Sequence, residues 1–353
     1  MGRNDEPGGG AVGGSPRSRR AALLGAGAGI AALSLGRGAG PVGGVVGGLV
    51  GGLSPGRGWG GAAALPSAGP VAPVPPRPRA VAYVGNDVEP LAALEAWLGG
   101  PLDGVQLHGG SADWEDWSGS IEWLIGRWRE AGRPIYWSIP LMAQGATLRE
   151  VADGAFADRF ERAARALAQA TDGAAYVRTG WEFNGDWMHW SAVGREAEYA
   201  AAFRRFVETF RSVSDRFVFE WCPNVGHYGS DPEDAYPGDD VVDVIGMDFY
   251  YDQRWMSPDP EAAWREMVER PVGLRWHQAF AAERGKPTAY SEWGVELETA
   301  APYLRAAAAW FREHPVLYQC YWHSDAAFRS RLHEGRMPEV GAAYRAAFGP
   351  AAR

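Results

Sequence analysis

Two glutamates come where an apolar run meets a cluster of aromatic residues. Glu182 lies within RTGWEFNGDWMHW (residues 178–190), and Glu292 lies within SEWG (residues 291–294). Cleavage of a glycosidic bond needs two opposed carboxyl groups, one to protonate the leaving oxygen and one to attack the sugar or activate water. We therefore interpret the two glutamates as a catalytic pair. For either one alone, a buried structural acid satisfied by Arg or Trp donors is the alternative.

The elements that would position this pair begin near residue 80. Short apolar runs, which predict strands, cover residues 80–84, 104–107, 134–139, 174–179, 217–222, 242–247, 287–291 and 316–322. Helical spacing of apolar residues is found at residues 156–170, 196–213, 260–284 and 303–313. Eight strand-then-helix units predict an α/β fold, a (β/α)8 TIM barrel in a single catalytic domain. A doubly wound open sheet is the alternative, but no glycine-rich phosphate turn follows the first run.

The two glutamates follow the fourth and seventh predicted strands. In a closed barrel both positions lie at the carboxyl face, where active sites form. Retaining glycosidases hold their two carboxyl groups about 5–5.5 Å apart. We therefore expect double displacement through a covalent glycosyl-enzyme intermediate.

Four segments resemble, in the right order, the motifs of glycoside hydrolase family 26, the mannanase-containing family of clan A. They are residues 178–190, 221–224 (WCPN), 236–250 (from YPGDD to the Gly-x-Asp-x-Tyr stretch) and 291–294. The chain departs from the family at Trp181, where the family typically has His before the acid/base, and at Trp293, where it usually has Phe. The resemblance is thus to a divergent relative.

The resemblance implies a role for individual residues. Glu182 becomes the acid/base and Glu292 the nucleophile. Arg178 and Tyr250 become the groups that orient the nucleophile and tune its charge. Trp322, at the end of the eighth predicted strand, would form the floor of the central sugar subsite.

Further side chains on predicted loops and strand ends are candidates for contacting substrate, by hydrogen bonds or by stacking on a sugar ring. Core packing or loop capping is the alternative for each of them. These candidates are Trp114, Trp117, Trp181, Asn184, Trp187, Trp190, Trp221, Asn224, His227, Trp293 and His323.

Composition excludes several other classes of function. The net charge is −9 and the basic residues are scattered among acids, which argues against a nucleic-acid partner. The single lysine, Lys286, gives little support to Schiff-base chemistry. No His, Cys or acidic spacing predicts a metal site, so we expect no metal and no cofactor. For Cys222 and Cys320 we favour buried free thiols, with a disulfide left open. We expect a monomer.

The N-terminal region has the composition of an export signal. Residues 1–39 hold Arg19 and Arg20 before a short Ala- and Gly-rich apolar stretch, which predicts a twin-arginine-type signal segment. The stretch is too short and glycine-rich for a span of about 20 residues. Residues 40–79 predict a Gly/Pro/Ala-rich linker, and residues 80–353 the catalytic domain. We expect a protein secreted or located in the periplasm or cell envelope, without a stable membrane span after signal removal; whether the signal is cleaved stays open.

These observations together predict an endo-acting retaining hydrolase of an extracellular or envelope polysaccharide. Two alternatives use the same barrel: a polysaccharide-binding protein without turnover, and a transglycosylase that uses the same two glutamates. The polymer, its linkage and the endo or exo mode stay open.

Overall fold

The computed structural model describes residues 73–352. The predicted signal segment and most of the predicted linker lie outside the described residues. The strands are β1 (Arg79–Tyr83), β2 (Gly104–His108), β3 (Ile135–Ser138), β4 (Ala175–Arg178), β5 (Phe217–Trp221), β6 (Val244–Tyr251), β7 (Thr288–Val295) and β8 (Val316–Trp322). Each pairs in parallel with the next and β8 pairs with β1, so the sheet is a closed barrel. The predicted (β/α)8 fold is confirmed.

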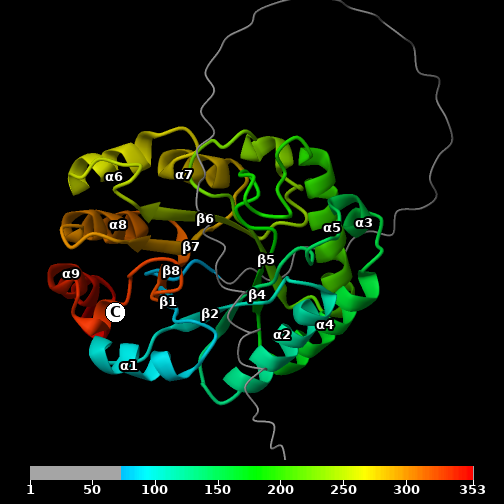
Figure 1. The fold of residues 1–353 in the computed structure, drawn as a ribbon, viewed down its shortest axis with the longest axis horizontal. Helices are drawn as coiled ribbons and strands as arrows, with labels where there is room; N and C mark the ends of the chain where they lie inside the picture. Colours follow the sequence, from blue (N-terminus) through cyan, green and yellow to red (C-terminus); the bar gives the residue numbers. More distant parts are fainter. Residues whose placement is uncertain (1–72, 353) are drawn as a thin grey trace, which may run out of the picture.

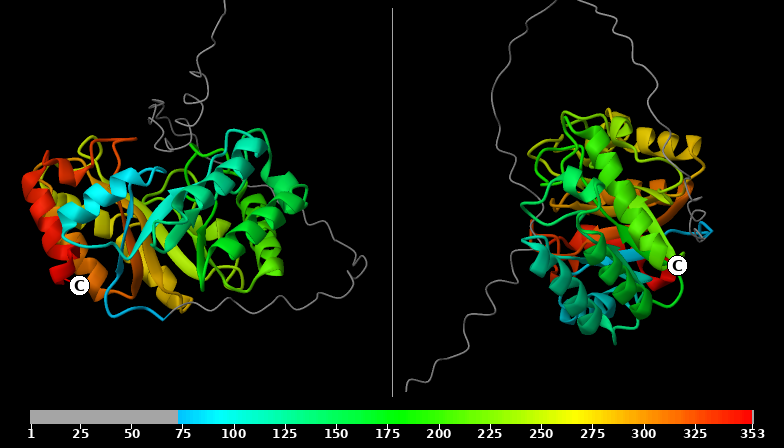
Figure 2. Two further views of the ribbon diagram at one scale, coloured as in Figure 1. Left: turned by 90° about the horizontal axis from the view of Figure 1, so that it is seen from below. Right: turned by 90° about the vertical axis from the view of Figure 1, so that its right-hand side faces the viewer.

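Helices surround this barrel (Figures 1 and 2). They are α1 (Glu89–Leu98), α2 (Trp114–Trp128), α3 (Leu148–Ala152), α4 (Ala157–Ala170), α5 (Glu196–Val213), α6 (Pro260–Glu269), α7 (Leu274–Glu283), α8 (Ala301–Glu313) and α9 (Pro338–Phe348), with 3-10 turns η1 (Pro232–Ala235), η2 (Leu332–Glu334) and η3 (Pro350–Ala352). The α5 prediction matches in both bounds. The stretch at 260–284 was predicted as one helix and is two. Pro271 explains the break, because it lacks an N–H and disfavours helical conformation in the residue before it.

The strand β7 is longer than the sequence suggested. The apolar run ends at Ser291, but pairing continues to Val295, so Glu292 lies inside the strand and not beyond it. The register of β7 shifts between Tyr290 and Trp293 against β8. Such irregularities change the direction in which a strand presents its side chains, and this one lies at the candidate nucleophile.

The barrel interior is unusually polar near the carboxyl ends of its strands. TIM barrels generally fill this space with Val, Ile and Leu. Here the buried inward-facing polar residues include Gln106, Ser138, Arg178, Glu220, Asp248, Ser291 and Glu292. The larger apolar cluster lies between the strands and the helices instead. Burial of these polar groups costs free energy unless they form hydrogen bonds or ion pairs with one another.

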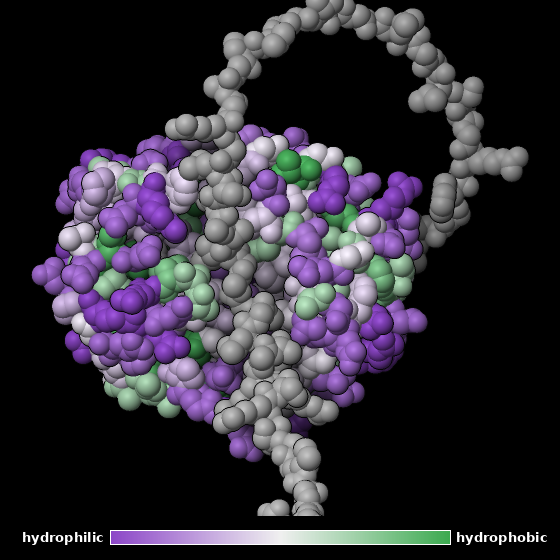
Figure 3. Space-filling view, viewed as in Figure 1, coloured by the Kyte–Doolittle hydropathy of each residue, from purple (hydrophilic) through white to green (hydrophobic). Residues whose placement is uncertain are grey.

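Few large apolar side chains are exposed among residues 73–352. On the face seen in Figure 3, hydrophilic and apolar side chains are interspersed. The exposed large apolar side chains among the described residues are Val74, Trp123 and Trp255. No helix within residues 73–352 has the length and apolarity needed to cross a membrane.

Candidate active site

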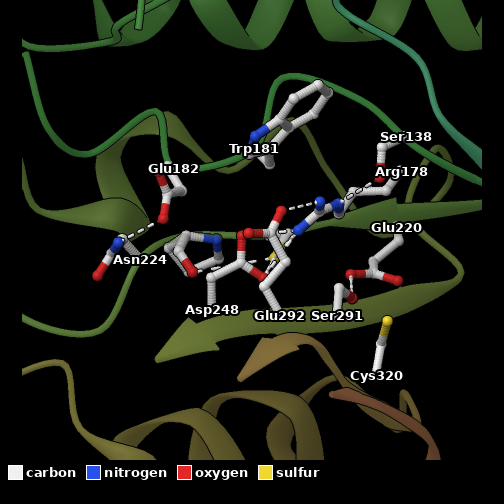
Figure 4. A network of polar contacts seen from close by, with 12 residues as sticks. Ser138, Arg178, Trp181, Glu182, Glu220, Asn224, Asp248, Ser291, Glu292 and Cys320 are labelled. Carbon is white, nitrogen blue, oxygen red and sulfur yellow. Dashed lines mark hydrogen bonds and ion pairs between the residues drawn. The ribbon is translucent and has the colours of Figure 1, made fainter. Parts of the chain in front are cut away.

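Arg178 is the centre of the polar layer. Its Nη1 contacts the two carboxylate oxygens of Asp248 at 2.8 and 2.6 Å, and its Nη2 donates to Oε1 of Glu292 (Figure 4). Its Nε donates to the hydroxyl of Ser138 at 3.0 Å. Arg178 is the last residue of β4. Its guanidinium therefore links β4 to β3, β6 and β7 and fixes the Glu292 carboxylate inside the barrel mouth.

The surroundings of Glu292 favour its ionised form. The phenol of Tyr250 donates to its Oε2 at 2.9 Å, and Arg178 holds its Oε1. Burial alone would raise the pKa of Glu292, but the charge of Arg178, together with these two hydrogen bonds, outweighs burial and lowers that pKa below its usual value. A carboxylate that attacks a sugar must be ionised, so this environment suits a nucleophile.

Glu182 is presented by a strained turn just after β4. It has a left-handed φ of 54°, uncommon for a residue with a side chain, and follows Gly180 at φ 59°. Its backbone N–H donates to the carbonyl of Cys222 at 2.8 Å, which ties the turn to β5. Backbone strain of this kind persists where the surroundings hold it, often at functional sites.

Two donors hold the Glu182 carboxyl group. The indole of Trp187 donates to Oε2 at 2.8 Å, and the amide of Asn224 donates to Oε1 at 2.5 Å. Burial, and then the negative charge of Glu292, raise the pKa of Glu182 to about 7, against the opposing effect of these two hydrogen bonds. The structure therefore holds one carboxyl group that keeps its proton near neutral pH beside one that does not.

Aromatic side chains surround the pair. Trp181 lies over the Arg178 guanidinium at 4.9 Å from the ring centre and packs edge-on against Trp190 at 4.7 Å. The ring of Trp322 lies 4.2 Å from that of Tyr83. Trp187 is half-buried next to Glu182. Trp181 and Trp322 are nearly buried, with a small exposed fraction of 7% and 3%.

One residue beside Glu292 was not among the candidates from the sequence. His108 ends β2, and its Nε2 lies 3.7 Å from Oε1 of Glu292 without a hydrogen-bond partner among the described residues. Burial lowers its pKa to about 4, so the imidazole is neutral at pH 7. The place of His108 directly after the second apolar run was the available signal.

Two predicted substrate contacts require correction. Trp221 packs against Phe183 and Phe280, and Trp293 packs against Phe311 and donates to a glutamine on β8. Both indoles are fully buried between the barrel wall and the helices. Side chains alternate across a strand, and because the preceding glutamates of β5 and β7 point inward, these tryptophans point outward.

Asn184 also has a different role from the predicted one. Its amide donates to the carbonyls of Asn224 and Gly226, and its oxygen accepts from the Asn224 N–H at 2.9 Å. It is fully buried and so supports the loop that carries Asn224. His227, on the same loop, is exposed.

The remaining candidates lie mainly in packing positions. Trp117 is buried in the core, and Trp114 packs on Phe156 at 4.1 Å. The indole N–H of Trp190 donates to the backbone carbonyl of Trp181 and so helps to hold Trp181 in place. His323 is buried against a second histidine. Cys222 and Cys320 are buried free thiols, as the sequence favoured. Residues 73–352 hold no cluster of three or more potential metal ligands.

Comparison with known proteins places this geometry in context. Residues 162–312 match the sequence model of Glycosyl hydrolase family 26, a range that contains both glutamates. A mannan endo-1,4-beta-mannosidase of Bifidobacterium adolescentis is 34% identical over 119 residues, which is 32% of this chain and 11% of that protein. The match thus covers about a tenth of the relative's length.

Solved structures resemble the whole barrel. An endo-beta-1,4-mannanase of Cellulomonas fimi has a TM-score of 0.55 at 21% identity over 75% of this chain and 70% of its own. The catalytic domain of a GH26 endo-beta-1,4-mannanase of Bacillus sp. JAMB-750 has 0.57 at 16% identity, covering 77% and 86%. A GH26 beta-mannanase of Bacteroides ovatus has 0.54 at 15%, covering 76% and 88%. These likenesses support the fold.

Proposed function

We propose that this chain, whose residues 162–312 match the sequence model of Glycosyl hydrolase family 26, is a retaining glycosidase that cleaves a polysaccharide by double displacement. The observation that carries the proposal is the contrast between the two buried carboxyl groups. Glu182 keeps its proton up to about pH 7, whereas Arg178 and Tyr250 keep Glu292 ionised. Divergent pKa values of this kind assign acid and nucleophile.

In the first step the Glu182 carboxyl transfers its proton to the glycosidic oxygen as the bond from that oxygen to the anomeric carbon breaks. A carboxylate oxygen of Glu292 forms the new bond to that carbon, which gives a glycosyl ester. Attack consumes the negative charge of Glu292. Arg178 remains paired with Asp248, so the guanidinium stays in position while the ester exists.

The second step uses the same residues with reversed proton flow. Because Glu292 is now esterified, the negative charge that raised the pKa of Glu182 is gone, and that pKa falls. Glu182, ionised after the first step, accepts a proton from water as the water oxygen attacks the anomeric carbon and the ester bond breaks. The donors Trp187 and Asn224 stabilise the ionised form that this step requires.

We propose an endo-acting enzyme on a β-linked polysaccharide, with β-1,4-mannan as the first candidate. The relatives' mannanase names support this choice. His108 supports it physically, since a neutral, unpartnered imidazole beside Glu292 can bind a sugar hydroxyl of the central subsite. Trp181, near the same imidazole at 5.5 Å, would limit the room for substituents there.

The experiment is a screen of the purified full chain against mannans, xylans, glucans and bacterial exopolysaccharides, with product sizing. An endo enzyme lowers viscosity early and releases a range of oligosaccharides. Glu292→Ala, as the matched control, should show no turnover. Retention of a polymer without any bond cleavage by the wild-type chain would favour the binding-protein alternative. Products longer than the starting oligosaccharides in concentrated glycan would favour the transglycosylase.

The proposed place of action is outside the cytoplasm, in the medium, periplasm or cell envelope. The support is the paired Arg19 and Arg20 before a short apolar stretch. Fractionation of cells that express the full chain tests this, with an Arg19→Lys, Arg20→Lys double variant as control. Equal amounts of wild type and variant outside the cytoplasm would contradict the twin-arginine route.

A further inference from the structure

A closed triangle of hydrogen-bonding groups lies inside the barrel, next to the active site but outside the mechanism above. The carboxyl group of Glu220 on β5 contacts the hydroxyl of Ser291 through Oε1 and the phenol of Tyr318 through Oε2 (Figure 4 shows the first contact). The Ser291 and Tyr318 oxygens lie 3.0 Å from each other. All three side chains are buried.

The number of hydrogens that the triangle needs indicates whether Glu220 is protonated. Three contacts between three groups need three hydrogens if each contact is a hydrogen bond. Ser291 and Tyr318 bring one each. An ionised Glu220 only accepts, so both hydroxyls would point at it and their 3.0 Å contact with each other would have no hydrogen. A protonated Glu220 supplies the third: Glu220 donates to Ser291, Ser291 to Tyr318, and Tyr318 back to Glu220.

The charges around Glu220 agree with this count. The nearest cation, Arg178, gives its hydrogen bonds to Ser138, Asp248 and Glu292, and no ion pair to Glu220 occurs among the described residues. The other titratable groups near the carboxyl are the thiols of Cys222 and Cys320. Burial raises the pKa of Glu220 against the weaker opposing effect of Arg178 and the hydrogen bonds. A lone buried carboxylate would be costly.

The neighbouring strand β6 leaves room for this carboxyl group. Gly246 on β6 faces Glu220, and a Cβ on Gly246 would lie 2.0 Å from Oε1 of Glu220. The carboxyl therefore packs against bare backbone at the point where the β6 register begins to shift. Ser291 is the direct neighbour of Glu292, in the stretch of β7 whose register against β8 also shifts.

We propose that Glu220 is a neutral carboxylic acid that positions the nucleophile. It holds Ser291, and through the adjoining peptide bond it fixes the place of Glu292 in an irregular part of β7. Because it carries no charge, Arg178 is left to Asp248 and Glu292. The effect on the nucleophile depends on the function proposed above, whereas the protonation of Glu220 does not.

The first test reads the proton without any need for activity. Infrared difference spectra of the full chain, wild type minus Glu220→Gln, are recorded at neutral pH with and without 13C-labelled glutamate. We expect a 13C-sensitive carboxylic-acid carbonyl band that is lost in the variant. A carboxylate band lost in its place would overturn the proposal. Should Glu220→Gln fail to fold, Tyr318→Phe serves as the second variant, because it removes one hydrogen bond of the triangle. If Glu220 is protonated, its carboxylic-acid band must shift in this variant. If Glu220 is ionised, there is no such band to shift, and the proposal is overturned.

The second test concerns position. Ser291→Ala and Tyr318→Phe should lower kcat about tenfold with little change in KM, because each breaks the triangle. Tyr290→Phe is the matched control, since its phenol lies on the outer side of β7 and bonds Gln278 and Trp310. In Glu220→Gln both limbs of the pH profile should stay in place. If both limbs moved to lower pH, a negative charge had been removed and the neutral-acid proposal fails.

Discussion

The phenol of Tyr250 donates a 2.9 Å hydrogen bond to Oε2 of Glu292. The two residues come from neighbouring strands, 42 positions apart in the chain. Since Oε1 is already held by Arg178, this contact gives each carboxylate oxygen a hydrogen-bond donor. A hydrogen bond to an ionised group stabilises the charged form and so lowers its pKa.

Tyr250→Phe should therefore raise the pKa of Glu292. Since Glu292 must be ionised for attack, the acidic limb of the kcat/KM profile should move to higher pH. Loss of a hydrogen bond to a charged group costs about 1.5–3 kcal/mol, which corresponds to a fall in kcat/KM of about 10- to 150-fold. Tyr251→Phe is the control, because its hydroxyl bonds the carbonyl of Ser257 on the outer side. An acidic limb that does not move contradicts the role of Tyr250.

Trp187→Phe addresses the other carboxyl group. It removes the N–H that bonds Oε2 of Glu182 while keeping an aromatic ring against Tyr228. That hydrogen bond lowers the pKa of Glu182, so its loss should raise the pKa above about 7. Activity requires protonated Glu182, so the basic limb should extend to higher pH and the acidic limb should stay. Trp276→Phe, which loses an indole bond to Glu233, should change neither limb. A basic limb shifted to lower pH would argue against this reading.

Glu182→Ala should separate the two chemical steps. For substrates with poor leaving groups, loss of the general acid should cost about 10²- to 10⁴-fold in rate. With good leaving groups the first step should survive, and azide should restore the second step because it attacks without a base. The glycosyl azide should keep the anomeric configuration of the substrate. No azide adduct, or an adduct of opposite configuration, would remove Glu182 from the acid/base role.

Sequence reasoning reached the barrel because its strand and helix periods are local. It also named Glu182 and Glu292 from the sequence pattern, and Arg178 and Tyr250 from the family resemblance, and the structure brings Arg178 and Tyr250 into contact with Glu292. It failed where a prediction depended on the face of a strand on which a side chain lies. Trp221 and Trp293 stand next to inward-facing glutamates and therefore face outward, which follows only once the strand face is known.

Contacts between distant strands were beyond the sequence. His108 is brought to Glu292 by barrel closure, from 184 positions away in the chain (292 minus 108). The Glu220 triangle joins β5, β7 and β8. The place of His108 at a strand end was its one local signal, and the triangle had none, because both contacts form only when distant strands come together. The break between α6 and α7, by contrast, had a local signal in Pro271, which the periodic apolar pattern obscured.

A chain that starts near Arg77 should fold alone. Arg77 pairs with Asp103 at 2.9 Å, and the same carboxylate accepts from the Ala80 N–H at 2.8 Å, so the first strand is anchored within this shorter chain. Calorimetry should show one cooperative transition at the temperature found for the full chain. An insoluble product, or loss of cooperative melting, would contradict the assignment of residues 40–79 as a linker.

The central claim is that Glu292 attacks the anomeric carbon, and the stereochemistry of the first-formed product tests it most directly. Proton NMR is recorded during the first minutes of hydrolysis of a β-linked substrate, before mutarotation mixes the anomers. Two displacements at one carbon should give the β-anomer first. If the α-anomer appears first, water has attacked the substrate directly, and Glu292 would be a general base and not the nucleophile.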